Sequence, residues 1–294
     1  MLKMNKKSYK NYTPWILLIP VLLIMGLLVI YPIIKTFLFS LYKYNLMNPN
    51  DTKFIGLKNY IEVFKSNEFY NTFFNSLIIV FFVIIIGFIC SMIVGLILNK
   101  KSKLSPVLTA IAIIPWALPP IVNGIIWRFI FYPGYGLANK FLIFFGVINE
   151  PISWTTNRYL LMMVISIVVV WRVIPFCAIV VLANLQTIPS ELYEVSYVDG
   201  ANAFQRFMKI TLPMIMPSLG IVLINLTMNA INVFDEIISI NGYATEGQTL
   251  LVYNYMNTFR FMNFGLGSAI TYIIMISSGV LGYFYIKSMS KDVV

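Results

Sequence analysis

The sequence contains no histidine and only two cysteines among its 294 residues. The missing histidine excludes the usual acid–base group near neutral pH, histidine ligands for zinc and every Ser-His-Asp triad. Cys90 and Cys177 both lie inside apolar runs, which argues against a disulfide framework or a cysteine-rich metal site. We therefore expect neither a catalytic centre nor a metal site in this chain.

Charged residues are also scarce, at 11% of the chain, whereas 59% of residues are hydrophobic. Soluble domains carry about 25% charged residues, so this composition indicates a protein that lies mostly in lipid. The net charge of +10 comes from lysines and arginines that stand between long apolar runs, as they do beside membrane helices. A basic face with aromatic platforms, typical of nucleic-acid binding, is missing, and we expect no nucleic-acid partner.

Six apolar stretches reach the length of about 20 residues that a membrane-spanning helix needs. The sequence therefore predicts an all-α membrane protein, with a six-helix transmembrane domain over 14–286 and short tails at 1–13 and 287–294. The first stretch is longer than the apolar core of a signal peptide, about 7–15 residues, so we expect it to be retained. The six stretches are residues 14–34, 76–98, 107–127, 159–185, 214–234 and 266–286.

Lysine and arginine are about twice as dense in one set of connecting segments as in the other, and the short cluster at 100–103 is the strongest example. The positive-inside rule places the richer set in the cytoplasm. This orientation gives a multi-pass protein with both termini cytoplasmic. The richer set consists of 1–13, 99–105, 186–212 and 287–294.

The segment between the fourth and fifth stretches, residues 189–213, is polar and has the pattern of two short helices. Pro189 suits a first helical turn, and Glu191 and Glu194 lie near the positive end of that helix's dipole. Gly200 can end the helix with a positive φ.

A second short helix is predicted to begin at Asn202, which forms a capping-box pattern with Gln205. Pro213 is expected to limit this helix, because proline disrupts a helix interior. From these features alone, an amphipathic helix lying on the membrane face would be an equally good interpretation.

This segment resembles the "EAA" loop of ABC-importer permease subunits, whose pattern is Glu-Ala-Ala, three residues, Gly, and then a hydrophobic-Pro ending. Val195 and Ser196 replace the two alanines of that pattern, so this helix surface is bulkier. The matching residues are Glu194-Val195-Ser196, Asp199-Gly200-Ala201, Phe204, Phe207 and Leu212-Pro213.

Segments across most of the chain are similar to the carbohydrate-uptake, maltose-type branch of these permeases. One departure is that Asn241-Gly242-Tyr243 stands where the branch has Gly-Gly-Pro. The similar segments include Gly56-Leu57-Lys58-Asn59-Tyr60, Trp171-Arg172-Val173-Ile174-Pro175-Phe176, Leu182-Ala183-Asn184-Leu185-Gln186-Thr187-Ile188-Pro189 and Phe264-Gly265-Leu266-Gly267-Ser268-Ala269.

The resemblance implies that the loop is a coupling helix docked in a cleft of a separate ATPase. It also implies a second homologous permease, two ATPase subunits that hold ATP and Mg, and an extracytoplasmic solute-binding protein at the bacterial cytoplasmic membrane. The chain itself would bind no cofactor and would form the path for an oligosaccharide or related sugar. The implied coupling residues are Glu191, Glu194, Ser196, Asp199, Gly200, Ala201, Phe204 and Pro213.

The fifth stretch carries a polar stripe that is a candidate for the substrate pathway. Asn225, Asn229, Asn232 and Glu236 are spaced so that they would share an arc of about 60° on one helix. Asparagine offers both a donor and an acceptor to sugar hydroxyls. Hydrogen bonding between helices is an equally good explanation.

The third stretch contains Pro115, Pro119 and Pro120, which are expected to bend its helix. Trp116 could then stack on a sugar, and Asn123 is a second polar candidate for the pathway. The alternative is a kinked packing helix with tryptophans at the membrane interface.

Arg172, in the middle of the fourth stretch, is expected to face the bundle interior and find a partner. We favour a tie between helices over a contact at the cavity. Asp235 and Glu236 are expected at the solvated outer end of the fifth stretch, in a structural or gating role.

Other functions remain open at this point. The same architecture would serve the import of a polyamine, iron or an oxyanion. A stand-alone secondary transporter should show inverted repeats and coupling carboxylates deep in its spans, and a membrane enzyme would need a nucleophile beside the Asp235–Glu236 pair. Residues 242–249 imitate a phosphate-binding loop but lack its lysine, so ATP hydrolysis is expected on partner subunits.

Overall fold

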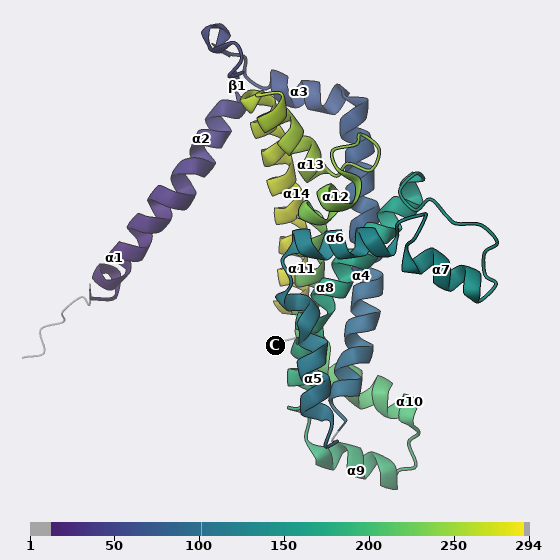
Figure 1. Ribbon diagram of the computed structural model, residues 1–294. Helices are drawn as coiled ribbons and strands as arrows, with labels where there is room; N and C mark the ends of the chain where they lie inside the picture. Colours follow the sequence, from purple (N-terminus) through teal and green to yellow (C-terminus); the bar gives the residue numbers. More distant parts are fainter. Residues whose placement is uncertain (1–12, 101, 291–294) are drawn as a thin grey trace, which may run out of the picture. The chain divides into compact units, whose positions relative to one another are not determined.

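The computed structural model describes residues 13–100 and 102–290 (Figure 1). The predictions made for the terminal tails at 1–12 and 291–294 lie outside the described residues. The chain forms two compact units, one of Met1–Val63 with Asn257–Tyr272 and one of Phe64–Met256 with Ile273–Val294.

The smaller unit contains the first long helix and a short two-stranded hairpin. The strands β1 and β2 are antiparallel, with Tyr42 opposite Phe54, and they are a small addition to the predicted all-α fold. The elements up to the second unit are α1 (Thr13–Met25), a π-helical turn (Gly26–Ile30), α2 (Tyr31–Ser40), β1 (Tyr42–Lys43), a 3-10 turn (Pro49–Asp51), β2 (Lys53–Phe54) and α3 (Lys58–Lys65).

The larger unit is built around α4, α8 and α11, which pack against one another. The remaining helices follow in chain order. The elements from α4 onward are α4 (Asn67–Leu98), α5 (Ser105–Ile113), a 3-10 turn (Ile114–Ala117), α6 (Pro120–Ile130), α7 (Leu137–Phe144), α8 (Arg158–Leu185), α9 (Ser190–Val198), α10 (Ala203–Arg206), a π-helical turn (Phe207–Thr211), α11 (Leu212–Ile231), α12 (Asp235–Asn241), α13 (Leu250–Tyr255), a π-helical turn (Met256–Arg260) and α14 (Phe264–Ser290). Within this set, Asn257–Tyr272 belongs to the smaller unit.

Helix α8 is the centre of the core, because its sequence is apolar on nearly every side. Val168 and Val181 are fully buried, as are Ile79 on α4 and Leu226 on α11. A glycine on α4 allows the close approach: a Cβ on Gly95 would lie 2.7 Å from the Val181 Cγ1 atom. The buried core of the bundle thus lies where α4 and α11 pack against α8.

The predicted membrane fold is confirmed, and so is the bend expected at the prolines of the third span. Each of the other five predicted stretches lies mainly on a helix long and apolar enough to cross a membrane. The third is a pair of helical segments, Ser105–Ala117 and Pro120–Ile130, bent by 98°. Leu118 and Pro119 are extended at the break, as expected for a residue before proline and for a proline outside a helix. The five unbroken helices run over Leu17–Ser40, Asn67–Leu98, Arg158–Leu185, Ala203–Ile231 and Phe264–Tyr285.

The bounds predicted for the fifth span are wrong at both ends. It begins at Ala203 rather than 214, and Pro213 does not limit a helix. The π-helical turn Phe207–Thr211 ends two residues before the proline, which lies in the first turn of α11, where its missing N–H is tolerated. The span ends at Ile231, before a non-helical break leads into α12.

A close contact between α6 and α12 depends on Gly124. A Cβ at this position would lie 1.8 Å from the Ser239 Oγ atom and 3.0 Å from the Glu236 Cα atom. Such a clash with a neighbouring helix forces the two apart.

We expect Gly124→Ala to lower the free energy of unfolding by about 1–3 kcal/mol, the usual cost of overpacking. The matched control is Gly282→Ala on α14, where a Cβ meets no atom within 4 Å; glycine to alanine in an open helix should stabilise by about 0.5–1 kcal/mol. Thermal unfolding of the two purified variants in the same detergent measures whether each substitution lowers or raises the stability. Equal shifts in the two variants would contradict the close contact.

In the hairpin of the smaller unit, Asp51 is held by two lysines. Lys43 and Lys53 both form salt bridges to its carboxylate, the latter at 2.6 Å from Nζ to Oδ1. The hydrogen bond from Lys43 is the largest cause that lowers the pKa of Asp51 from 3.8 to about 2, and the hydrogen bond from Lys53 is the next largest.

Because this pKa is lower in the folded chain, the pairing contributes stability above pH of about 4 and loses it as pH falls toward 2. We expect the Asp51 carboxylate to stay ionised at pH 3. Infrared titration of the wild type minus Asp51→Asn isolates this carboxyl band. A midpoint near 4 would show that the lysines do not hold it.

Candidate functional site

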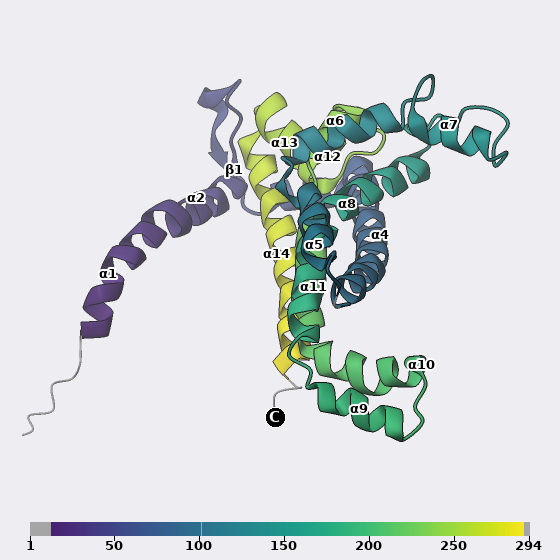
Figure 2. The ribbon, with the colours of Figure 1, turned by 60° about the horizontal axis from the view of Figure 1, so that its bottom comes forward.

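The segment predicted as a coupling loop forms two short helices beyond one end of the α4/α8/α11 bundle, the end away from α12 (Figures 1 and 2). We call Ser190–Arg206 the α9–α10 hairpin. Gly200 has φ of +74°, and its N–H donates to the Tyr197 carbonyl at 3.1 Å. The glycine therefore ends α9 as predicted, because few other residues adopt this conformation.

The start of α10 also agrees with the sequence. The Asn202 side chain accepts from the Gln205 N–H, and the Gln205 side chain accepts from the Asn202 N–H, both at 2.9 Å. This reciprocal pair is the predicted capping box. Pro189 differs slightly, since it precedes the first turn of α9 rather than lying within it.

Side chains between the two helices fix the shape of the hairpin. The Ser196 hydroxyl is buried and donates to the Tyr193 carbonyl at 2.6 Å. Arg206 donates to the Ala201 carbonyl and lies over the Tyr197 ring, 3.8 Å from its centroid. A guanidinium over an aromatic ring is attractive, so Arg206 connects α10 to the turn and to the end of α9.

Both helices of the hairpin expose large apolar side chains. Val198 is 89% exposed and Phe204 71% exposed, and Val195 is also open. Glu191 and Glu194 are exposed on the same helix. An apolar patch with carboxylates at its edge typically marks a protein interaction surface.

The eight predicted coupling residues do not all lie in one place. Glu191, Glu194 and Phe204 are exposed, as are Asp199 and Gly200, whereas Ser196 is buried. Pro213 belongs to α11 and lies outside the hairpin. The remaining members, together with Ser196, line a cavity of about 430 Å³ between the helices, with Asp199, Gly200, Ala201, Gln205, Arg206, Lys209 and Ile210 on its walls.

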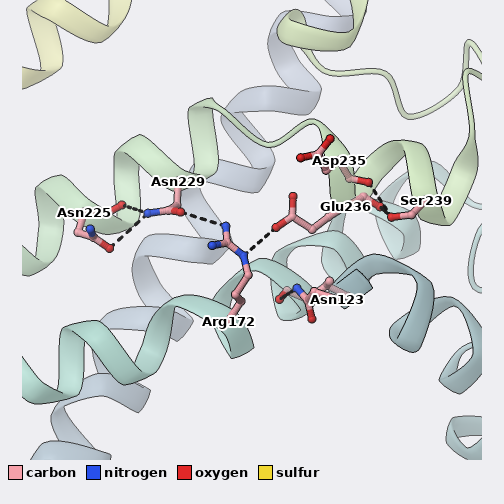
Figure 3. Close-up of polar contacts among 8 residues, drawn as sticks. Asn123, Arg172, Asn225, Asn229, Asp235, Glu236 and Ser239 are labelled. Carbon is pink, nitrogen blue, oxygen red and sulfur yellow. Dashed lines mark hydrogen bonds and ion pairs between the residues drawn. The ribbon is translucent and has the colours of Figure 1, made fainter. Parts of the chain in front are cut away.

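A second cluster of polar side chains lies inside the bundle, around Arg172 on α8 (Figure 3). The Arg172 Nε donates to the Glu236 Oε1 at 3.0 Å, and its Nη2 donates to the Asn229 Oδ1 at 3.1 Å. The Asn229 amide in turn donates to the Asn225 carbonyl at 2.9 Å. The arginine thus connects α8 with α11 and α12, which is the helix-to-helix tie favoured from the sequence.

Two expectations about Glu236 are wrong. It lies on α12 rather than on the fifth span, and it is only 2% exposed rather than solvated. The break at Asn232–Phe234 turns the chain, so Glu236 points back toward Arg172. Periodicity along one helix could not predict this geometry, because the helix ends between Asn229 and Glu236.

Around this cluster lies a cavity of about 210 Å³, which we call the polar pocket. It contains three of the six predicted pathway residues and the predicted intramembrane arginine. Asp235, which is half-buried, also lines it, although that carboxylate was expected at the solvated end of the fifth stretch. The lining residues are Pro120, Arg172, Met228, Asn229, Asn232, Asp235 and Glu236.

The other three predicted pathway residues do not line the polar pocket. Asn123 is fully buried and donates to the Val168 carbonyl at 3.0 Å, so it packs α6 against α8. Trp116 is half exposed and stacks on Phe176 at 6.0 Å between ring centroids. Asn225 accepts from the Asn229 amide at 3.3 Å but is not among the residues that line the pocket.

Comparison with known proteins identifies the family to which this chain belongs. Residues 87–293 match the family model described as "Binding-protein-dependent transport system inner membrane component". The chain belongs to this family of membrane components of binding-protein-dependent transport systems.

The curated relatives of this permease match over nearly their full length. The trehalose/maltose transport system permease protein MalF of Thermococcus litoralis is 34% identical, over 95% of this chain and 94% of that protein. The sulfoquinovosyl glycerol transport system permease protein SmoG of Agrobacterium fabrum is 29% identical, over 99% of this chain and 98% of that protein.

Solved structures show the same fold. A crystal structure of a bacterial ABC transporter involved in import of the acidic polysaccharide alginate contains a chain that matches with a TM-score of 0.83 at 19% identity, over 98% of this permease and 99% of that chain. The alginate transporter in complex with an alginate pentasaccharide-bound periplasmic protein matches with a TM-score of 0.79 at 20% identity, over 95% and 94%.

Proposed function

We propose that this permease forms part of the pathway of an ATP-driven importer that carries a carbohydrate, and that it catalyses no reaction itself. The observation that carries the proposal is the polar pocket with a buried Arg172–Glu236 pair at 3.0 Å. Ionisable residues inside membrane helices are costly, and they commonly mark a substrate pathway. The relatives named for trehalose/maltose and sulfoquinovosyl glycerol support a sugar cargo.

The α9–α10 hairpin is the proposed contact with an ATPase subunit. It lies outside the bundle and exposes Val195, Val198 and Phe204 beside carboxylates, so a groove with apolar walls and cationic side chains would fit it. ATP and Mg would be held by two such ATPases. Their closure would push the hairpin and rock the spans between inward-open and outward-open states.

The remaining partners follow from this arrangement. A second, homologous permease would complete the pathway, and an extracytoplasmic solute-binding protein would deliver the sugar. The alginate transporter solved with a periplasmic protein supports such a partner. Both termini and the hairpin would lie in the cytoplasm of a bacterial cell, in line with the positive-inside rule.

Purification of the tagged chain from its native membrane in mild detergent, followed by mass spectrometry, tests the proposal. We expect a second six-span permease and an ATPase with a phosphate-binding loop to follow the chain. Uptake into proteoliposomes of the complex and its binding protein then identifies the cargo. Recovery of the chain alone after cross-linking in the membrane would favour a stand-alone transporter, and uptake of a polyamine, iron or an oxyanion but no sugar would refute the carbohydrate cargo.

A further inference from the structure

The side chains that line the polar pocket include more acidic groups than basic ones. Arg172 is its one cationic lining residue, whereas Asp235 and Glu236 are both acidic. The guanidinium is engaged by the Glu236 carboxylate at 3.0 Å, with the arginine side chain 16% and the glutamate side chain 3% exposed. This pair is neutral overall, which leaves Asp235 as the net charge of the pocket.

The pocket also offers a ligand more free hydrogen-bond acceptors than donors on its acidic and amide side chains. Within residues 13–100 and 102–290, no hydrogen bond or ion pair engages the Asp235 carboxylate or the second oxygen of Glu236. The Asn232 amide nitrogen donates to the Met228 carbonyl at 2.9 Å, so its Oδ1 remains as an acceptor. Donors left for a ligand come mainly from the unused N–H groups of Arg172.

We propose that this pocket selects an uncharged, hydroxyl-rich sugar unit and rejects acidic sugars. Hydroxyl groups supply the donors that its carboxylate and amide oxygens accept. A uronate or sulfonate would instead lie beside the Asp235 carboxylate, and it would find Arg172 already paired. Like charges placed side by side repel each other, which disfavours binding of an acidic ligand.

The size of the pocket limits how much of a ligand it contacts. Cavities for whole drug-sized ligands measure about 300–1,000 Å³, whereas this one measures about 210 Å³. It would therefore hold one unit at the end of an oligosaccharide, and selection would act on the charge of that unit. This inference rests on the proposed carbohydrate function and narrows it.

The test is equilibrium binding to the assembled importer in nanodiscs, without its binding protein, so that the permeases alone select. The probes are three neutral disaccharides (trehalose, maltose and lactose) and short uronate oligosaccharides from alginate. For the wild type we expect the best neutral probe to bind at least about tenfold tighter than any uronate.

Asp235→Lys should shift the ratio of uronate to neutral affinity by at least about tenfold toward the uronate, and Asp235→Asn should shift it less, in the same direction. The matched control is Glu68→Lys, the same charge reversal at the wall of a different cavity; it should leave the ratio unchanged. Because Asp235→Asn keeps the side-chain shape, it tests the charge even if the lysine variant fails to assemble.

The outcomes separate this inference from the proposed function. Equal or tighter uronate binding by the wild type, or an unchanged ratio in both Asp235 variants, would overturn the selection of neutral sugars and leave a carbohydrate importer in place. If neither probe class binds, and proteoliposomes with the binding protein take up no sugar, the proposed function itself fails.

Discussion

Replacement of Gly200 by proline is expected to abolish solute uptake while the protein still inserts in the membrane. Proline fixes φ near −65°, whereas Gly200 has φ of +74°. The substitution also removes the N–H that donates to the Tyr197 carbonyl. The end of α9 would unwind, and the exposed face with Val198 and Phe204 would lose its shape.

Loss of shape in the α9–α10 hairpin should matter for function rather than for folding. The hairpin lies beyond the end of the bundle (Figure 1), and its exposed side chains make few contacts that stabilise the core. If the hairpin transmits ATPase closure, its distortion should reduce ATP-dependent uptake by at least about a hundredfold, because a misplaced rigid contact cannot move the spans.

Gly146 offers a matched control for this substitution. It also has a positive φ, +68°, no atom within 4 Å of its Cβ position, and an N–H that donates to a carbonyl three residues earlier, that of Ile143 at 2.9 Å. Gly146→Pro therefore causes the same local damage in the connection after α7. We expect it to retain most uptake, and measurement of ATP-driven uptake with equal amounts of each variant in the membrane compares them.

Uptake by Gly200→Pro at the level of Gly146→Pro would remove the coupling role from the hairpin. The milder Gly200→Ala keeps the N–H but strains the φ, so it should fall between the wild type and the proline variant. If Gly200→Pro failed to insert in the membrane while Gly146→Pro inserted normally, the prediction would also be contradicted. The turn at Gly200 would then be needed for folding or insertion.

The features that the sequence predicted well are local ones. The glycine end of α9 and the capping box at Asn202–Gln205 each depend on residues within four positions of one another. The proline bend in the third span is local too, as its 98° break falls at the predicted prolines. Apolar stretches placed the spans because a helix must satisfy its own backbone in lipid.

The features that it missed depend on where a helix stops. Apolar residues continue past Ile231, so composition alone extended the fifth span and put Glu236 on the same face as Asn229. The unwound segment before Asp235 reverses that placement and buries the glutamate against Arg172. The contact that Asn123 makes was not predicted either, because a polar residue in a span can satisfy a backbone carbonyl of a neighbour as readily as it can line a pathway.

Arg172→Met is expected to have the largest effect on stability of any single substitution in this bundle. It would leave the Glu236 carboxylate, only 2% exposed, without its ion-pair partner. Removal of one member of a buried pair costs about 3–5 kcal/mol, since the remaining charge stays desolvated. We expect a fall of this size in the free energy of unfolding, seen as a lower unfolding temperature of the purified protein.

Arg128→Met is the matched control, because it removes an exposed arginine on α6 whose contact there is a 3.5 Å hydrogen bond to the Ser239 carbonyl. It should change stability by no more than about 0.5 kcal/mol. Equal unfolding temperatures for Arg172→Met and Arg128→Met would refute the importance of the buried pair.

A double variant separates the pair's contribution to stability from its contribution to transport. Arg172→Met with Glu236→Leu removes both charges, and apolar replacement of a buried ion pair is often neutral or stabilising. We therefore expect the double variant to regain most of the stability lost by Arg172→Met. Sugar uptake should stay low in both, because the polar pocket would lose its donor and one of its carboxylates. Recovery of uptake along with stability would mean that the pair only holds α8 to α12, and that the cargo passes elsewhere.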